Sequence, residues 1–260
     1  PASALEAPVV TGSDGEPALD PATGLPRPES ISEWSDRPDG EALLNGSAAA
    51  RRPAAASRRI YSDLTTDALN SSRNRLEPGN PALTATILGL GPHDAETPED
   101  VINWLLNEPV LGDPGLQPPV STGDADDDSR TIYLATHDGL LHAFDTDTGI
   151  ERWAFLPRTL LPRLPGLIRN EVTTARSHGI DGPLVLHRHD PDGDGSIDVS
   201  AGEHLWLLFG LGRGGVGYYV LDVANPEEPQ LMWSLDAEAA GDHALSLPEP
   251  VVVRLAIDGA

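Results

Sequence analysis

Aspartates recur on alternate residues in one short segment, in a spacing typical of a calcium-binding loop. Gly195 permits a sharp bend there, Ile197 can anchor the loop to the protein body, and Ser196 is placed to offer its backbone carbonyl. Carboxylate and carbonyl oxygens are the ligands that Ca²⁺ prefers. The sequence therefore predicts one calcium site, made of Asp190, Asp192, Asp194, Ser196 and Asp198.

The predicted loop departs from an EF-hand at its last ligand position, which is Ala201 instead of glutamate. Either Glu203 or a water molecule is left to complete the coordination. Neighbouring carboxylates repel one another without a cation, so the sequence favours metal binding over the alternative, a solvated acidic turn. A second acidic run, residues 124–128, lacks the glycine bend and the aliphatic anchor, and we expect an exposed loop there.

The remaining chemistry-bearing residues predict no catalytic site. Residues 210–215 have the glycine spacing of a dinucleotide-binding turn, but a strand follows, so a phosphate would lack its helix N-terminus. His178, His187 and His189 lack the spacing of a zinc site on a helix, and His189 abuts the predicted calcium loop, where we expect it on the surface. The chain has no cysteine, which excludes thiolate zinc sites and a cysteine nucleophile. We therefore expect no enzyme activity.

The charge of the chain excludes two classes of partner. Asp and Glu number 41 against 17 Lys and Arg, giving a formal net charge of −24. Non-specific nucleic-acid binding needs a basic face that displaces phosphate counterions, and docking on anionic lipid needs basic residues as well. No apolar run approaches the roughly 18 residues of a spanning helix. We expect neither nucleic-acid binding nor membrane insertion.

Composition divides the chain into three regions. Residues 1–57 are rich in Pro, Gly and Ala without a sustained period, and we expect a disordered linker there. Residues 58–120 form a lead-in segment with a helix near 98–107, because Thr97 is a good N-cap and Pro98 suits the first helical position. Residues 121–260 are predicted to be all-β.

Short strands joined by tight turns recur within residues 121–260. Two sets of three are predicted, at 131–136, 140–144 and 150–155, and at 204–210, 218–223 and 230–235. Aligning residues 144–145 with 221–222 places Trp153 near Trp233, so both tryptophans are predicted to be buried anchors of successive β-propeller blades. Residues 250–255 look like the opening strand of a further blade.

Blade size limits the architecture. At about 40–50 residues per blade, residues 121–260 hold about three blades, whereas closed propellers use about four to eight. The predicted fold class is an all-β partial β-propeller with a short helix and a disordered N-terminal segment. We expect the ring to be incomplete within this chain.

The ordered motifs resemble the PilC/PilY family of type IV pilus tip-associated proteins. Over residues 58–260 they are RIY at 59–61, VINWL at 101–105, LGDP at 111–114, DGLLHAFD at 138–145, TG at 148–149, WAFLP at 153–157, LLP at 160–162, GLGRGG at 210–215 and YYVLDV at 218–223.

The resemblance implies a modified β-propeller with a calcium site, displayed with type IV pili at the cell surface, outer membrane or periplasm. Its implied activities are pilus assembly, calcium-linked extension and retraction, and cell adhesion. Its implied partners are minor pilins and the pilus machinery. The large adhesive N-terminal region of the family is missing here, so a host or surface receptor would be bound through regions outside this chain.

Two other functions remain open at this point. A quinone-dependent dehydrogenase has a related propeller, but would need a cofactor-stacking tryptophan at the ring centre and a full set of blades. An exported interaction scaffold would use the calcium loop only for structure. Quinone absorbance would favour the enzyme, whereas loss of pili on gene deletion would favour the pilus protein.

Overall fold

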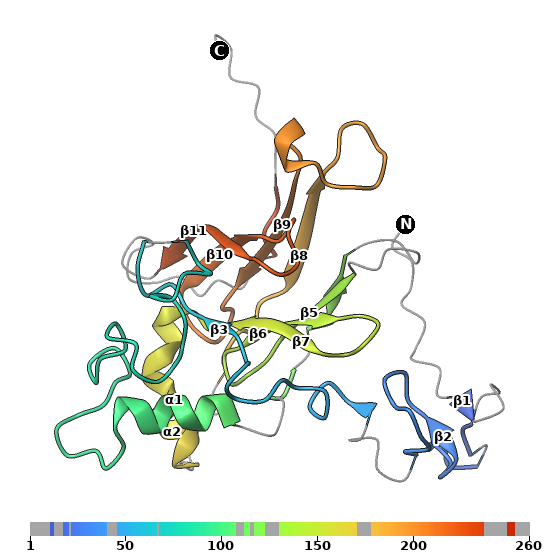
Figure 1. The fold of residues 1–260 in the computed structure, drawn as a ribbon, viewed down its shortest axis with the longest axis horizontal. Coiled ribbons are helices and arrows are strands. Elements are labelled where there is room, and N and C mark those ends of the chain that lie inside the picture. Colours follow the sequence, from blue (N-terminus) through green and yellow to red (C-terminus); the bar gives the residue numbers. More distant parts are fainter. Residues whose placement is uncertain are drawn as a thin grey trace.

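Two sheets lying side by side form the body of the protein in the computed structural model (Figure 1). The structure describes residues 11–12, 18–20, 22–40, 46–66, 68–107, 112–114, 117–122, 130–170, 178–236 and 249–252. Most of the regular elements among these residues are strands, and helices are few. This confirms the all-β prediction for this part of the chain.

The first sheet has the strand order β3-β7-β6-β5-β4. Its strands are β3 (Ile60–Tyr61), β4 (Val120–Ser121), β5 (Thr131–Ala135), β6 (Leu141–Asp145) and β7 (Glu151–Phe155). Neighbouring strands are antiparallel, except that β3 pairs with β7 in parallel. Asp145 shapes the turn after β6 by accepting a hydrogen bond from the Thr148 amide (2.8 Å). The three strands predicted from the sequence are confirmed as β5, β6 and β7.

The second sheet is an antiparallel meander in which strands follow their order in the chain. It consists of β8 (Leu184–His189), β9 (His204–Gly210), β10 (Gly217–Asp222) and β11 (Gln230–Asp236). The last three were predicted, whereas β8 was not. Residues 250–252 lie outside any strand, and residues 253–260 lie outside the described part of the chain, so the further blade strand stays a prediction.

Helix α1 (Pro98–Asn107) confirms the predicted helix and lies with α2 (Leu164–Ile168) below the first sheet in Figure 1. The Thr97 hydroxyl accepts a hydrogen bond from the Asp100 amide (3.2 Å), and Asp100 accepts one from the Thr97 amide (2.9 Å). This reciprocal cap satisfies amides that the first helical turn leaves unpaired. The 3₁₀ helix η2 (Arg158–Arg163) leads from β7 into α2.

A two-stranded pair, β1 (Thr11–Gly12) with β2 (Ser30–Ile31), lies apart from the two sheets (Figure 1). Trp34 connects this region to the first sheet by donating a hydrogen bond to the carbonyl of Thr146 (2.8 Å). Within residues 1–57, residues 1–10, 13–17, 21 and 41–45 lie outside the described part of the chain. The assignment of that region as a linker, and the boundaries at 58–120 and 121–260, stay predictions.

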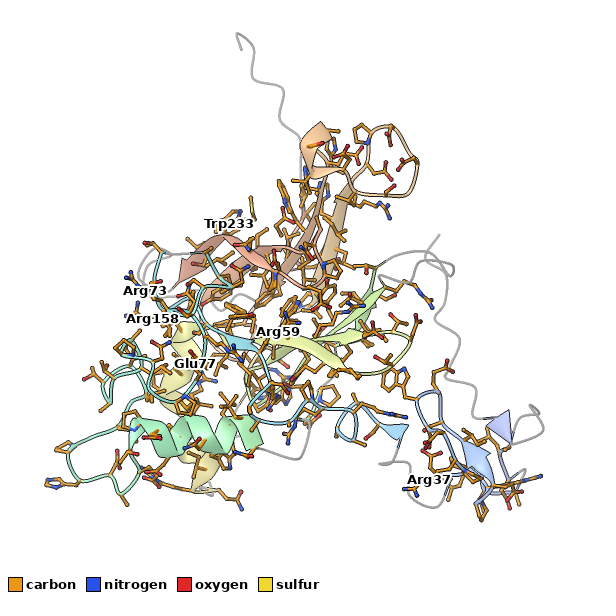
Figure 2. All side chains as sticks on the ribbon, viewed as in Figure 1. Arg37, Arg59, Arg73, Glu77, Arg158 and Trp233 are labelled. Carbon is orange, nitrogen blue, oxygen red and sulfur yellow. The ribbon has the colours of Figure 1, made fainter. Side chains whose placement is uncertain are left out.

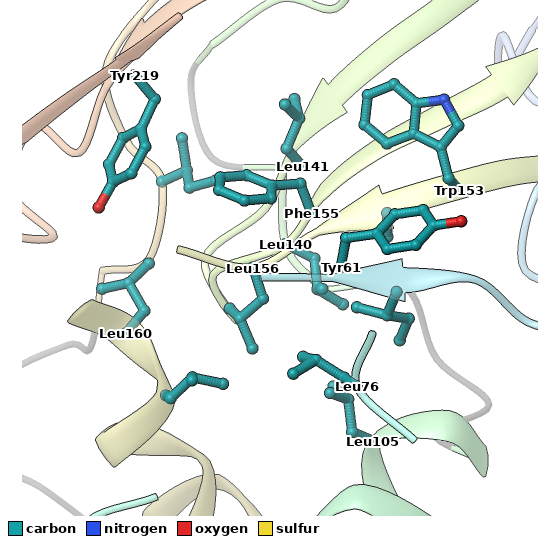
Figure 3. Packing of buried hydrophobic residues seen from close by; sticks show 14 of the residues in the cluster. Tyr61, Leu76, Leu105, Leu140, Leu141, Trp153, Phe155, Leu156, Leu160 and Tyr219 are labelled. Carbon is teal, nitrogen blue, oxygen red and sulfur yellow. The ribbon is translucent and has the colours of Figure 1, made fainter. Parts of the chain in front are cut away.

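Aromatic side chains join the two sheets into one hydrophobic core, part of which Figure 3 shows. The Phe155 ring of β7 lies 5.8 Å from the Tyr219 ring of β10 and 6.3 Å from the Phe209 ring of β9. Trp153 is fully buried, and its indole nitrogen donates to the Pro226 carbonyl (2.8 Å) in the turn between β10 and β11. A residue of the first sheet is thus covered by a turn of the second.

Trp153 and Trp233 occupy equivalent places in their sheets but differ in burial. Trp153 pairs with Ala143 beside a register shift that leaves Arg152 of β7 unpaired, and Trp233 pairs with Val220 beside the same kind of shift at Met232 of β11. The prediction of burial is confirmed for Trp153 and wrong for Trp233, which is 52% exposed on the outer side of β11 (Figure 2). The reason is that no turn among the described residues covers Trp233 as the β10–β11 turn covers Trp153.

The paired tryptophans give a direct stability test. Trp153→Ala is expected to lower the free energy of unfolding by about 3–5 kcal/mol, because it opens a cavity and removes the hydrogen bond to the Pro226 carbonyl. Trp233→Ala, the matched control, should cost less than about 1 kcal/mol, since its side chain is half exposed. Urea unfolding followed by circular dichroism measures both, and equal losses would contradict this view of the core.

Candidate functional site

The predicted calcium loop projects from the end of the second sheet, between β8 and the 3₁₀ helix η3 (Val199–Ala201) (Figure 1). Figure 2 shows oxygen-bearing side chains gathered around it. Gly193 and Gly195 have φ angles of 71° and 86°, in the left-handed region that favours glycine. The paired strands β8 and β9 hold the two ends of the loop together, with His189 opposite His204.

Three of the predicted ligands converge. One carboxylate oxygen from each of Asp190, Asp192 and Asp194 lies within 4.8 Å of the other two. Oxygen ligands 2.3–2.6 Å from one Ca²⁺ lie at most about 5 Å apart, so a single ion fits this spacing. Loop amides orient the carboxylates: Gly193 donates to Asp190 (2.8 Å) and Ser196 donates to Asp194 (2.7 Å).

The loop backbone also keeps Asp190 ionised. Desolvation acts to raise the pKa of Asp190, but the amides of Gly193 and Gly195 outweigh it and lower that pKa. An ionised carboxylate with both oxygens held by backbone amides is prepared for a cation.

The structure does not bring Asp198 into this group. Its Oδ1 caps η3 by accepting hydrogen bonds from the Ser200 amide (2.8 Å) and hydroxyl (2.6 Å), and the Ser200 hydroxyl is the main cause of the lowered pKa of Asp198. Glu203 is buried, and its carboxylate accepts a hydrogen bond from the Asp198 amide (2.8 Å). Glu203 therefore fastens the far end of the loop.

Arg188, whose positively charged side chain lies against the loop, was missed in the sequence analysis. The Nε of Arg188 lies 3.3 Å from Asp190 Oδ2, and its guanidinium donates to the carbonyls of Gly195 and Ser196. The predicted carbonyl ligand, that of Ser196, is 3.5 Å from this guanidinium. The signal was the position of Arg188 at the end of a strand, two residues before the first aspartate. Arg188 offsets part of the repulsion among the carboxylates.

A second cluster of side chains that are able to ligate a metal lies between the two sheets. His137 Nε2 lies 3.0 Å from Asp181 Oδ1, and His178 Nδ1 lies 4.0 Å from the same oxygen. Arg213 forms a two-pronged ion pair with Asp181, at 2.5 and 2.9 Å. The hydrogen bond from Arg213 is the main cause that lowers the pKa of Asp181 to about 2; burial opposes it and His137 adds to it.

Only His178 of this second cluster was considered from the sequence. The other members are far from it in the chain, so no local spacing signals their approach. His187 and His189 are partly exposed on one face of β8, which agrees with the surface position expected for His189. They gather there with His204 and Trp206, whose rings stack at a centroid distance of 3.8 Å.

A buried polar network links the first sheet to the lead-in segment. Glu151 accepts hydrogen bonds from His142 Nδ1 (2.7 Å) and from Arg58 Nε (2.6 Å), and Arg58 also donates to the Leu105 carbonyl of α1 (2.8 Å). Burial raises the pKa of Glu151, but the bonds from His142 and Arg58 outweigh it and hold the pKa at about 2.

This network resembles the geometry of a catalytic triad, because Thr136 Oγ1 lies 3.4 Å from His142 Nε2. The Thr136 hydroxyl, however, is buried and bonds the Leu140 carbonyl (2.9 Å), and Arg58 neutralises Glu151. The network therefore has a structural explanation, because it satisfies buried polar groups and joins β7 to Arg58 and α1. Among the helices that the structure describes, none is long and apolar enough to span a bilayer.

The chain is similar to type IV pilus biogenesis factors. It is 30% identical over 135 residues to the type IV pilus biogenesis factor PilY1 of Pseudomonas aeruginosa strain UCBPP-PA14, which covers 51% of this chain and 11% of that protein. It is 32% identical over 123 residues to a PilY1 homolog of Xylella fastidiosa strain Temecula1, covering 47% of this chain and 9% of that protein. The predicted family resemblance is thus confirmed over about half of the chain.

The chain spans about a tenth of the length of these curated relatives. The crystal structure of the P. aeruginosa PilY1 C-terminal domain is 29% identical, over 48% of this chain and 22% of that chain, with a TM-score of 0.33. No protein-family model matches the chain.

The pKa of Glu151 predicts how stability depends on pH. Because the folded pKa is about 2 and the ordinary value is 4.5, the stabilisation is complete above pH 4.5 and is lost as the pH falls toward 2. Glu151→Gln should cost about 3–5 kcal/mol at neutral pH, since it leaves Arg58 buried without its counterion. The difference in unfolding free energy between this variant and the wild type should become smaller as the pH falls from 4.5 toward 2.

Urea unfolding at a series of pH values measures that difference. Glu228→Gln removes an exposed carboxylate and serves as the control, with little loss expected at any pH. A Glu151→Gln variant as stable as wild type at neutral pH would show that the network is not formed.

Proposed function

We propose that this chain is the calcium-binding, non-catalytic β-propeller region of an exported, tip-associated type IV pilus biogenesis protein. The observation that carries the proposal is the 30–35% identity, over 123–135 residues, to curated type IV pilus biogenesis factors from two bacterial genera. The proposed partners are minor pilins and the pilus machinery, at the cell surface, outer membrane or periplasm. Adhesion to a host or surface receptor would require regions outside this chain.

The equivalence of the two sheets supports the propeller. Each contains an antiparallel meander of at least three strands, and β4 of one lies beside β8 of the other. Trp153 is covered by the β10–β11 turn of the second sheet, and Trp233 stands at the equivalent place on β11. In a repeating array of blades, a turn of a further blade would cover Trp233 in the same way. The described residues supply two such sheets and no closed ring.

The converging aspartates support the calcium site. Asp190, Asp192 and Asp194 meet the spacing for one ion. Hydrogen bonds from Ser200 and Ala201 engage only Oδ1 of Asp198, which leaves its Oδ2 available to an ion if the loop closes around it. Bound Ca²⁺ would neutralise the carboxylates more completely than Arg188 does. Fixing both ends of the loop in this way would make the projecting tip of the second sheet a rigid surface for a partner.

Calcium is expected to raise the melting temperature of the protein, because the ion binds the folded loop and not the unfolded chain. At a concentration about 100-fold above Kd the gain in stability is about 2.7 kcal/mol. Asp194→Ala should abolish the rise and leave the calcium-free melting temperature unchanged or slightly higher. Asp36→Ala, which removes an exposed aspartate elsewhere, should keep the full response.

Differential scanning calorimetry with and without millimolar Ca²⁺ measures these shifts. The calcium proposal fails if titration calorimetry detects no binding to the intact protein, or if Asp36→Ala and Asp194→Ala respond alike, since calcium would then act through net charge alone.

Gene deletion tests the pilus function separately. In the organism that encodes the chain, deletion should reduce surface pili and twitching motility, and the intact gene should restore both. Restoration with Asp194→Ala should give a weaker recovery or altered retraction. Unchanged piliation and motility after deletion would contradict the pilus function while leaving calcium binding to be judged by calorimetry.

A further inference from the structure

Three segments distant in sequence meet at the junction of the two sheets. His137 lies in the turn between β5 and β6, His178 and Asp181 precede β8, and Arg213 lies in the turn between β9 and β10. Backbone hydrogen bonds hold the middle segment in place, from the Ile180 amide to the first sheet and from the Asp181 amide to the Leu211 carbonyl (both 3.2 Å). The segment is therefore fixed on both sides before any ligand binds.

We propose that His137, His178 and Asp181 bind a divalent transition-metal ion such as Zn²⁺, which ties the two sheets together. One ligand atom from each side chain lies within 4.8 Å of the other two. Tetrahedral bonds of about 2.0–2.2 Å place ligand atoms about 3.4 Å apart. His137 Nε2 and Asp181 Oδ1, at 3.0 Å, already meet that spacing, and His178 at 4.0 Å would move inward by about half an ångström.

The donor set selects the class of ion. Two imidazole nitrogens and one carboxylate oxygen suit Zn²⁺ and similar borderline ions, whereas the aspartate loop offers only oxygen and suits Ca²⁺. Three protein ligands leave a fourth tetrahedral position for water. The two sites should therefore respond to different metals and can be studied independently.

Burial and outer contacts favour the site. The side chains of His137 and Asp181 are only 8% and 4% exposed, which shields the site from water. Arg213 donates to both oxygens of Asp181, from Nε to Oδ2 (2.5 Å) and from Nη2 to Oδ1 (2.9 Å), and so fixes the plane of the carboxylate, as outer-shell partners do. A metal would share Oδ1 with Arg213.

A second group of histidines also offers imidazole ligands for Zn²⁺, so the experiment has to distinguish binding there from binding at the proposed site. His187, His189 and His204 lie close together on the exposed face of β8 and β9, with ring centroids 4.8–5.7 Å apart. Their position on paired strands makes them the obvious competitor for Zn²⁺ in solution.

Titration calorimetry with Zn²⁺, on metal-free protein saturated with Ca²⁺, tests the site. One Zn²⁺ per chain is expected to bind. His178→Asn should lower the affinity roughly 10-fold or more, and His137→Gln should do the same. His204→Gln is the matched control and should leave the affinity unchanged. Co²⁺ in place of Zn²⁺ should give visible bands typical of tetrahedral coordination, which His178→Asn should remove.

His178 is more exposed than the other two ligands, at 17% against 8% for His137 and 4% for Asp181, so the His178→Asn variant is expected to fold and to keep its calcium response. That response shows that a loss of Zn²⁺ affinity is local. The proposal is overturned if Zn²⁺ does not bind, or if His204→Gln loses affinity while His137→Gln and His178→Asn retain it. Neither result bears on calcium binding or on the pilus function.

Discussion

The buried carboxylate of Glu151 is the constraint on which the rest of the structure depends. Removing a charge from water costs several kcal/mol unless hydrogen-bonding partners replace the water. Here the replacements come from His142 on the neighbouring strand and from Arg58, which lies 93 residues earlier in the chain. Arg58 also bonds a carbonyl in the last turn of α1, where a cation is favoured by the helix dipole. Strand β7 therefore cannot occupy its place without the lead-in segment and the helix.

From this centre the contacts run outward to the second sheet. Two residues that follow Glu151 in β7 contact the β10–β11 turn of the second sheet. Trp153 donates a hydrogen bond to the Pro226 carbonyl, and Arg152 forms an ion pair with Glu227 (2.5 Å). Behind them the rings of Phe155, Phe209 and Tyr219 pack together. The aspartate loop stands at the far end of the sheet fixed in this way, so its shape depends on packing that no residue of the loop supplies.

Local signals allowed much of the fold and part of the candidate site to be predicted. The helix cap at Thr97, the alternating strands around the 145–149 turn and the spacing of the aspartates are each readable within about a dozen residues. Strand β8 was missed because its histidines and arginine run directly into the aspartates and read as part of the loop. The exposure of Trp233 was missed because burial depends on what packs over a strand, and a single repeat does not show this.

Long-range pairs could not be predicted, for a physical reason. The contacts of Glu151 with Arg58, of Asp181 with His137 and of Asp181 with Arg213 join residues 93, 44 and 32 positions apart. No periodicity or cap relates residues at such distances, so their approach is set only by the packing of whole elements. Both polar clusters that link the elements were found from the structure.

Native-state hydrogen exchange is the most direct test of the claim that Glu151 makes the lead-in segment and the first sheet one cooperative unit. The account predicts that the buried amides of α1, near Leu105, and those of β6 and β7 exchange with the same opening free energy, equal to that of global unfolding. Rapid exchange in α1 by local opening, while β6 and β7 stay protected, would contradict it.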